Sequence, residues 1–177
     1  MVSKIIKVEI SGISPLLMHR FPLEPVKAIE KKSKEEQAEL AAYRDEASGN
    51  LYVPGTAIQR AFIGGAAYSK GKGRASLQKP VAACVFVTPE ICDLGVSEYV
   101  VDARAVVVPA TKGRIVRYRP RLDTWKVKFD LEYDPELLTE DQLRQIVDDT
   151  GRRVGLLDFR PANKGPFGRF SVTQWRK

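Results

Sequence analysis

Segment 155–170, which reads GLLDFRPANKGPFGRF, contains the residue types most typical of a loop that binds nucleic acid. Gly165 and Gly168 would let the backbone approach a ligand closely, and free amides there could hold a phosphate. Phe167 would offer a flat ring on which a base can stack. The alternative is a structural connection whose aromatic side chains pack into the core, and this is the expectation for Phe170. The loop also carries three bases: Arg160, Lys164 and Arg169.

Arginines alternate along a second segment, 109–121, which we predict to be the turn and strand of a basic β-ribbon. Arg117, Arg119 and Arg121 would lie on one face of an extended strand, roughly 6–7 Å apart. That spacing matches the phosphates of a single nucleic-acid strand. The alternative is a solvated edge strand that resists aggregation, for which Pro120 and a row of charges are also suitable.

His19 is the only histidine of the chain and the only candidate for acid–base catalysis of RNA cleavage. The sequence places no second general base or lysine beside it, and a lone histidine is more often structural or solvated. One histidine with Cys84 and Cys92 makes no zinc site, and the glycine-rich segments lack the spacing of a nucleotide-binding P-loop. We therefore expect no cofactor and no metal.

The composition is that of one globular domain of 177 residues, with 44% hydrophobic and 29% charged residues. We find no apolar run near the roughly 20 residues that span a bilayer, and no signal-peptide pattern at the N-terminus. We therefore expect a cytoplasmic protein with reduced cysteines and no membrane partner.

The formal net charge is +7, and acids and bases separate along the chain. Windows 60–80, 104–128 and 151–177 hold 20 of the 29 bases and two of the 22 acids, whereas windows 84–102 and 129–150 are acidic. This pattern predicts a molecule with a basic side and an acidic side, and the basic side suggests a polyanionic partner.

Hydrophobic periodicity predicts the elements that must position these residues. Capping boxes at Ser33, Thr56 and Thr139 mark the starts of the three expected helices. The helices are expected at 33–46, at 56–68 and from 139 onward. The strands are expected at 4–12, 81–87, 99–109, 124–134 and 170–175.

Without insertions at about 22–50 and 109–121, this order is β-α-β-β-α-β, the α+β ferredoxin-like or RRM-like arrangement, in a single domain 1–177. Two helices would cover one face of the sheet and leave the other open. Lys7, Lys126 and Lys128 would make the open face basic, as in many RNA-binding modules.

Three segments resemble the RAMP superfamily of CRISPR-associated proteins: SGISPLLMHR, YVPGTAIQRAF and the glycine-rich loop before the last strand. The likeness is to backbone subunits that polymerise along CRISPR RNA, and to related small proteins of phages or mobile elements. It implies an RRM-like core that binds single-stranded RNA, often in a helical assembly. Residue by residue, it carries over only to Arg60, Gly165, Gly168 and Arg169.

The leading hypothesis is therefore a non-enzymatic protein that binds a single strand of RNA or DNA, with RNA favoured, in an assembly with its own copies or with other effector subunits. One alternative is a metal-independent RNA-processing endonuclease that uses His19. The other is a phage structural or interaction protein. The predicted nucleic-acid-binding residues are Arg20, Arg60, Lys70, Lys72, Arg74, Lys112, Arg114, Arg117, Arg119, Arg121, Lys126, Lys128, Arg160, Lys164, Gly165, Phe167, Gly168 and Arg169.

Overall fold

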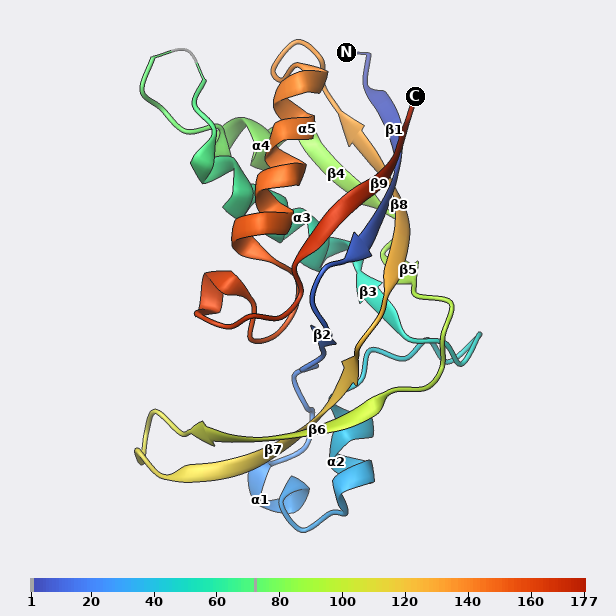
Figure 1. Ribbon diagram of the computed structural model, residues 1–177, viewed down its shortest axis with the longest axis vertical. Helices are drawn as coiled ribbons and strands as arrows, with labels where there is room; N and C mark the ends of the chain where they lie inside the picture. The colour runs from blue at the N-terminus through green and yellow to red at the C-terminus, as the bar shows by residue number, and fades with distance from the viewer. Residues whose placement is uncertain (1, 72) are drawn as a thin grey trace.

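A four-stranded antiparallel sheet, in the order β4-β8-β1-β9, forms the centre of the molecule in a computed structural model that describes residues 2–71 and 73–177 (Figure 1). Helices α3, α4 and α5 cover one face of this sheet. The chain order β1-α3-β4-β8-α5-β9 confirms the predicted ferredoxin-like core. The strands are β1 (Lys4–Gly12), β4 (Val85–Thr88), β8 (Lys126–Tyr133) and β9 (Phe170–Arg176). The helices are α3 (Gly55–Gly65), α4 (Gln78–Cys84) and α5 (Glu140–Asp149).

Alternation of side chains on β8 and β1 builds the core. From Trp125 onward, every second residue of β8 points toward the helices and is at most 7% exposed. The apolar stripe of α3 packs against this surface, with the rings of Phe62 and Phe129 at 5.9 Å between centroids. Burial of these large side chains stabilises the sheet and the helices together.

Two of the three predicted capping boxes form, at Ser33 and at Thr139. The third does not, because Pro54 precedes α3 and the Thr56 hydroxyl donates to Glu90 at 2.8 Å instead. The helix predicted at 33–46 is α2 (Lys34–Leu40) and ends early. The first residues of the strand predicted at 81–87 belong to α4.

A second lobe lies below the core in Figure 1. Its centre is the ribbon of β6 (Val100–Val107) and β7 (Arg114–Leu122), joined by the short strand β2 (Leu16–Leu17). The predicted insertion 109–121 holds only the turn and most of the second strand of this ribbon. The remaining elements are α1 (Val26–Ile29) and α2 beside the ribbon, and the paired strands β3 (Tyr52–Pro54) and β5 (Ile91–Asp93).

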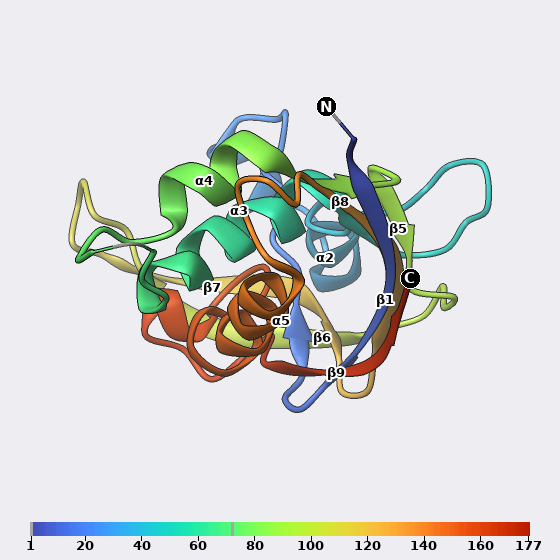
Figure 2. The same cartoon turned by 90° about the horizontal axis from the view of Figure 1, so that it is seen from above.

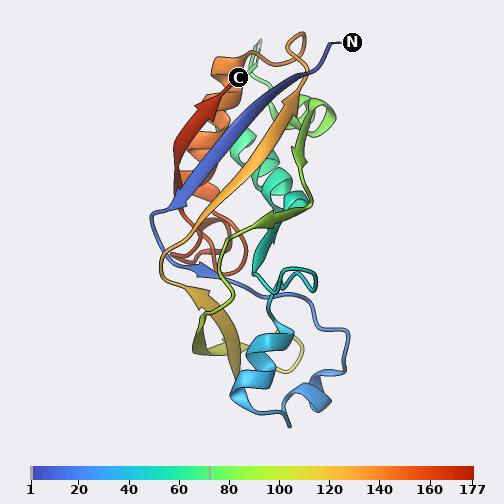
Figure 3. The same ribbon diagram turned by 90° about the vertical axis from the view of Figure 1, so that its right-hand side faces the viewer.

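The open face of the four-stranded sheet, which is turned toward the viewer in Figure 3, is mixed in charge, and this corrects the prediction of a basic face. Lys7 lies opposite Asp130 in the strand register, and Lys128 lies opposite Glu9 with 3.6 Å between Nζ and Oε2. Lys126 is exposed on the same face. Each of the two paired lysines therefore faces a carboxylate, and the face presents no uniform positive field to a polyanion.

None of the helices in the described part of the chain is long and apolar enough to cross a membrane. Cys84 and Cys92 are both free and buried.

Candidate nucleic-acid interface

Three basic projections extend to one side of the molecule, the side of the helices, in both Figure 1 and Figure 2. They are the loop before α4, the turn of the β6–β7 ribbon and the loop between α5 and β9. Their exposed bases are Lys70, Arg74, Lys112, Arg114 and Lys164. Lys72, also predicted here, lies outside the described residues. We call this side, defined by these five bases, the basic side.

Acidic loops lie on the opposite side in the same two views. One is the turn 45–50, which contains Asp45 and Glu46, and the other is segment 94–99, which contains Glu98. The open sheet face with Lys126 and Lys128 also lies away from the basic side (Figure 3). These two acidic loops therefore lie away from the basic side, whereas Asp141 and Asp149 of the acidic helix α5 lie near Lys70.

The glycine-rich loop is the structural connection that the sequence analysis gave as its alternative. Gly168 has φ +73°, and a Cβ on it would lie 2.0 Å from the Leu156 carbonyl oxygen. A Cβ on Gly165 would lie 1.9 Å from the Phe159 carbonyl oxygen. The Gly168 amide donates to Pro15 at 2.8 Å and the Gly165 amide to Arg160 at 3.0 Å. These glycines allow the loop to pack on itself, and their amides are not free to hold a phosphate.

Phe167 is buried, which contradicts its predicted role as a platform for base stacking. Its ring packs against Phe159 with 5.8 Å between centroids, and the guanidinium of Arg104 on β6 lies 4.8 Å from the Phe167 centroid. Phe170 is buried as expected. The aromatic rings of this loop therefore attach it to the ribbon and the core.

The three alternating arginines of β7 differ in their burial and in their ion pairs. Arg119 is buried and ion-paired with Asp158. Arg121 contacts Asp102 at 3.0 Å and Asp123 at 2.8 Å. Arg117, which is half-buried, forms no ion pair with any residue that the structure describes. Two of the three charges are thus neutralised within the protein, and the predicted row of phosphate contacts reduces to Arg117.

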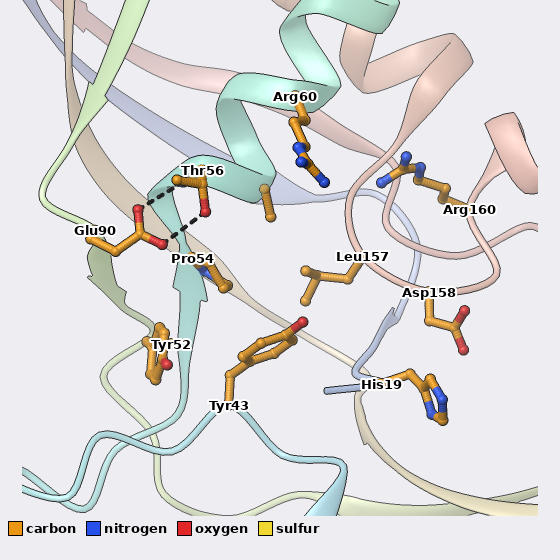
Figure 4. A pocket seen from close by; sticks show the side chains of 11 residues that line it. His19, Tyr43, Tyr52, Pro54, Thr56, Arg60, Glu90, Leu157, Asp158 and Arg160 are labelled. Atoms are coloured by element: carbon orange, nitrogen blue, oxygen red, sulfur yellow. Dashed lines mark hydrogen bonds between the residues drawn. The ribbon is translucent and has the colours of Figure 1, made fainter. Parts of the chain in front are cut away.

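A cavity of about 720 Å³ lies between the N-terminal end of α3, the loop 157–160 and the segments that follow β2 and α2 (Figure 4). It brings together residues that are far apart in sequence. The predicted residues His19, Arg60 and Arg160 line it, and so do Tyr43, Tyr52 and Asp158, which the sequence did not single out. Arg60 and Arg160 approach each other from two elements across one end of the cavity (Figure 4).

The cavity contains two arginines that pair with neither of its carboxylates. Its two carboxylates are occupied, because Glu90 accepts from the amide and hydroxyl of Thr56 and Asp158 is paired with Arg119. Arg60 and Arg160 take part in no ion pair within residues 2–71 and 73–177. The Arg160 Nε atom is buried and has no hydrogen-bond partner there. Such a guanidinium pair is suited to an anion.

His19 and Tyr43 have pKa values shifted by burial. Burial lowers the pKa of His19 below its usual value, with Asp158 opposing the shift and Arg119 and Arg117 adding to it. The imidazole is therefore neutral at pH 7. Burial raises the pKa of Tyr43, so its hydroxyl stays protonated and can donate a hydrogen bond.

Two further predicted residues, Arg20 and Arg169, do not line this cavity. Arg20 is exposed and lines a neighbouring hollow with Arg117. Arg169 is half-buried, and its amide donates to the Ser14 hydroxyl at 3.0 Å. The sequence did not indicate Tyr43 as a site residue because it lies within the helix expected at 33–46. No local pattern connects Tyr43 with Arg160, which is 117 positions later in the chain.

Comparison with known proteins was made by sequence and by fold. No family model and no curated protein sequence matches the chain. A solved chain in the cryo-EM structure of the Type III-B Cmr-beta bound to cognate target RNA matches with a TM-score of 0.53 at 13% sequence identity. The match covers 98% of this chain and 60% of that chain. The chain is therefore similar in fold to a part of that larger protein.

Proposed function

We propose that this protein binds single-stranded RNA without cleaving it, as a subunit of a CRISPR effector assembly of the RAMP type. The observation that carries the proposal is the cavity, which Arg60 and Arg160 line without an ion-pair partner among the described residues. The exposed bases of the basic side would supply further phosphate contacts along the strand. Phosphate contacts of this kind supply affinity without sequence preference.

Two observations favour RNA over DNA as the ligand. The solved chain of similar fold comes from a structure that is bound to target RNA. The helix entry VPGTAIQRAF, which contains Arg60, resembles that of RAMP subunits.

The separation of charge supports assembly with copies of the same chain. The acidic loops at Asp45 and Glu98 lie opposite the basic side, so a head-to-tail contact would bring these acids near bases of the next copy that the strand leaves free. A repeated contact of this heterologous type generates a helical array.

Titration of fluorescent single-stranded RNA, single-stranded DNA and duplex 30-mers across a salt series tests the proposal, with light scattering on the same samples. We expect RNA to bind tightest and large particles to form only with a single strand. Equal affinity for duplex, or no binding at 50 mM salt, would overturn the proposal.

A second candidate function is metal-independent RNA cleavage, which the position of His19 in the cavity favours. A neutral imidazole can accept a proton from a ribose 2′-hydroxyl. Incubation of hairpin and single-stranded RNA with a chelator present tests this function. Cleavage that is lost in His19→Ala would establish it, and intact RNA after long incubation would exclude it for these substrates.

A further inference from the structure

We infer that the cavity of Figure 4 holds one whole nucleotide, with its phosphate between Arg60 and Arg160 and its base against Tyr43. This inference deepens the proposed function, from which it takes the class of ligand. It adds a binding site for one whole nucleotide to a surface whose other proposed contacts are with phosphates only.

The size and polarity of the cavity fit such a ligand. About 720 Å³ lies within the range of pockets that hold small molecules, roughly 300–1,000 Å³. The two guanidiniums at one end supply fork-shaped donors without an internal acceptor, and the Arg160 Nε atom is buried without a partner among the described residues. A phosphate between them would accept from both.

The opposite wall offers an aromatic surface. Tyr43 and Tyr52 pack edge to face, with 5.8 Å between centroids and 63° between ring planes, and this contact restrains Tyr43. The Tyr43 hydroxyl points into the cavity (Figure 4). A restrained ring across the cavity from a pair of cations suits a ligand that has both a base and a phosphate. An acidic side chain would need only the cations.

The test uses the full chain and two probes, AMP and a single-stranded RNA 12-mer that carries 4-thiouridine. We expect AMP to bind about tenfold or more weakly to Arg60→Ala and to Arg160→Ala than to the unaltered chain. Tyr43→Leu should bind it about fivefold or more weakly. Lys126→Ala, which removes an exposed charge from the open sheet face, is the matched control and should bind AMP normally. Thermal melting of every variant confirms that it folds.

Photocrosslinking separates the two proposals. A crosslink from the RNA to Tyr43 or Tyr52, competed by AMP, supports the inference. Tight RNA binding with crosslinks only elsewhere and no effect of Arg60→Ala and Arg160→Ala would overturn the inference and leave the proposed function intact. AMP binding without RNA binding would support the pocket for a free nucleotide and overturn the proposed function. Binding of an acidic peptide in place of AMP would overturn the inference.

Discussion

Arg119 on β7 and Asp158 in the loop after α5 form an ion pair that joins the two lobes of the molecule. The guanidinium is 8% exposed and the carboxylate 27% exposed, so the pair is largely removed from water. The Asp158 amide also donates to Leu17 on β2 at 3.0 Å, and Arg104 on β6 covers the rings of Phe159 and Phe167. These contacts fix the ribbon beside the loop that forms one wall of the cavity.

Loss of either partner of this pair should destabilise the protein. We expect Arg119→Ala to lower the free energy of unfolding by about 3 kcal/mol, because the Asp158 carboxylate is left without its cation. Urea denaturation of Arg119→Ala, Asp158→Ala and the double variant measures the interaction free energy between the two residues. The double variant should lose less than the sum of the single losses, and strict additivity would show that the two residues do not interact.

The glycine-rich loop should be intolerant of a Cβ at Gly168. Alanine there would combine a left-handed backbone with a contact 2.0 Å from the Leu156 carbonyl oxygen, and we expect a loss of about 3 kcal/mol in stability. Gly49 is the matched control, because its φ is +75° but a Cβ on it meets nothing within 4 Å. Gly49→Ala should cost only about 1–2 kcal/mol in a denaturation measurement. Equal losses at both positions would contradict the close packing of the loop.

The pH dependence of stability should report on His19, the only histidine. Its pKa is lower in the folded chain than in the unfolded chain, so the unfolded state takes up the proton first as the pH falls below about 6.5. Stability should therefore decrease from about pH 6.5 downward. His19→Asn should remove this contribution, and the single imidazole resonance in an NMR titration gives the folded pKa directly. A folded pKa at or above 6.5 would refute the prediction.

The core of the fold was predictable from local patterns. The alternation on β8 and the capping boxes at Ser33 and Thr139 depend only on neighbouring residues, and all three form. The capping box predicted at Thr56 fails because Glu90, 34 positions later, takes the threonine hydroxyl. Long-range partners of this kind leave no mark on the local pattern.

The candidate site was predictable only in part, for the same physical reason. Arg60 and Arg160 were both expected to bind nucleic acid, but their meeting across one cavity depends on the tertiary fold. A glycine-rich segment before the last strand has the same composition whether its glycines contact a ligand or allow the loop to pack on itself. At Gly168 the close approach of the Leu156 carbonyl oxygen shows that the glycine is needed for the packing of the loop itself. The charges of Lys126 and Lys128 were expected on the open sheet face, and the same alternation places Glu9 and Asp130 there. Only the strand register shows that Lys128 lies opposite Glu9 and Lys7 opposite Asp130.

The salt dependence of RNA affinity in two matched double variants tests the central claim, that the basic side and not the open sheet face binds the strand. Lys112→Ala/Arg114→Ala and Lys126→Ala/Lys128→Ala remove the same charge from opposite sides of the molecule. We expect the first to weaken RNA binding and to reduce the slope of log affinity against log salt by about 1.4, roughly 0.7 for each lost phosphate contact. The second should leave the slope unchanged. A reduced slope only in the sheet-face variant would contradict the account.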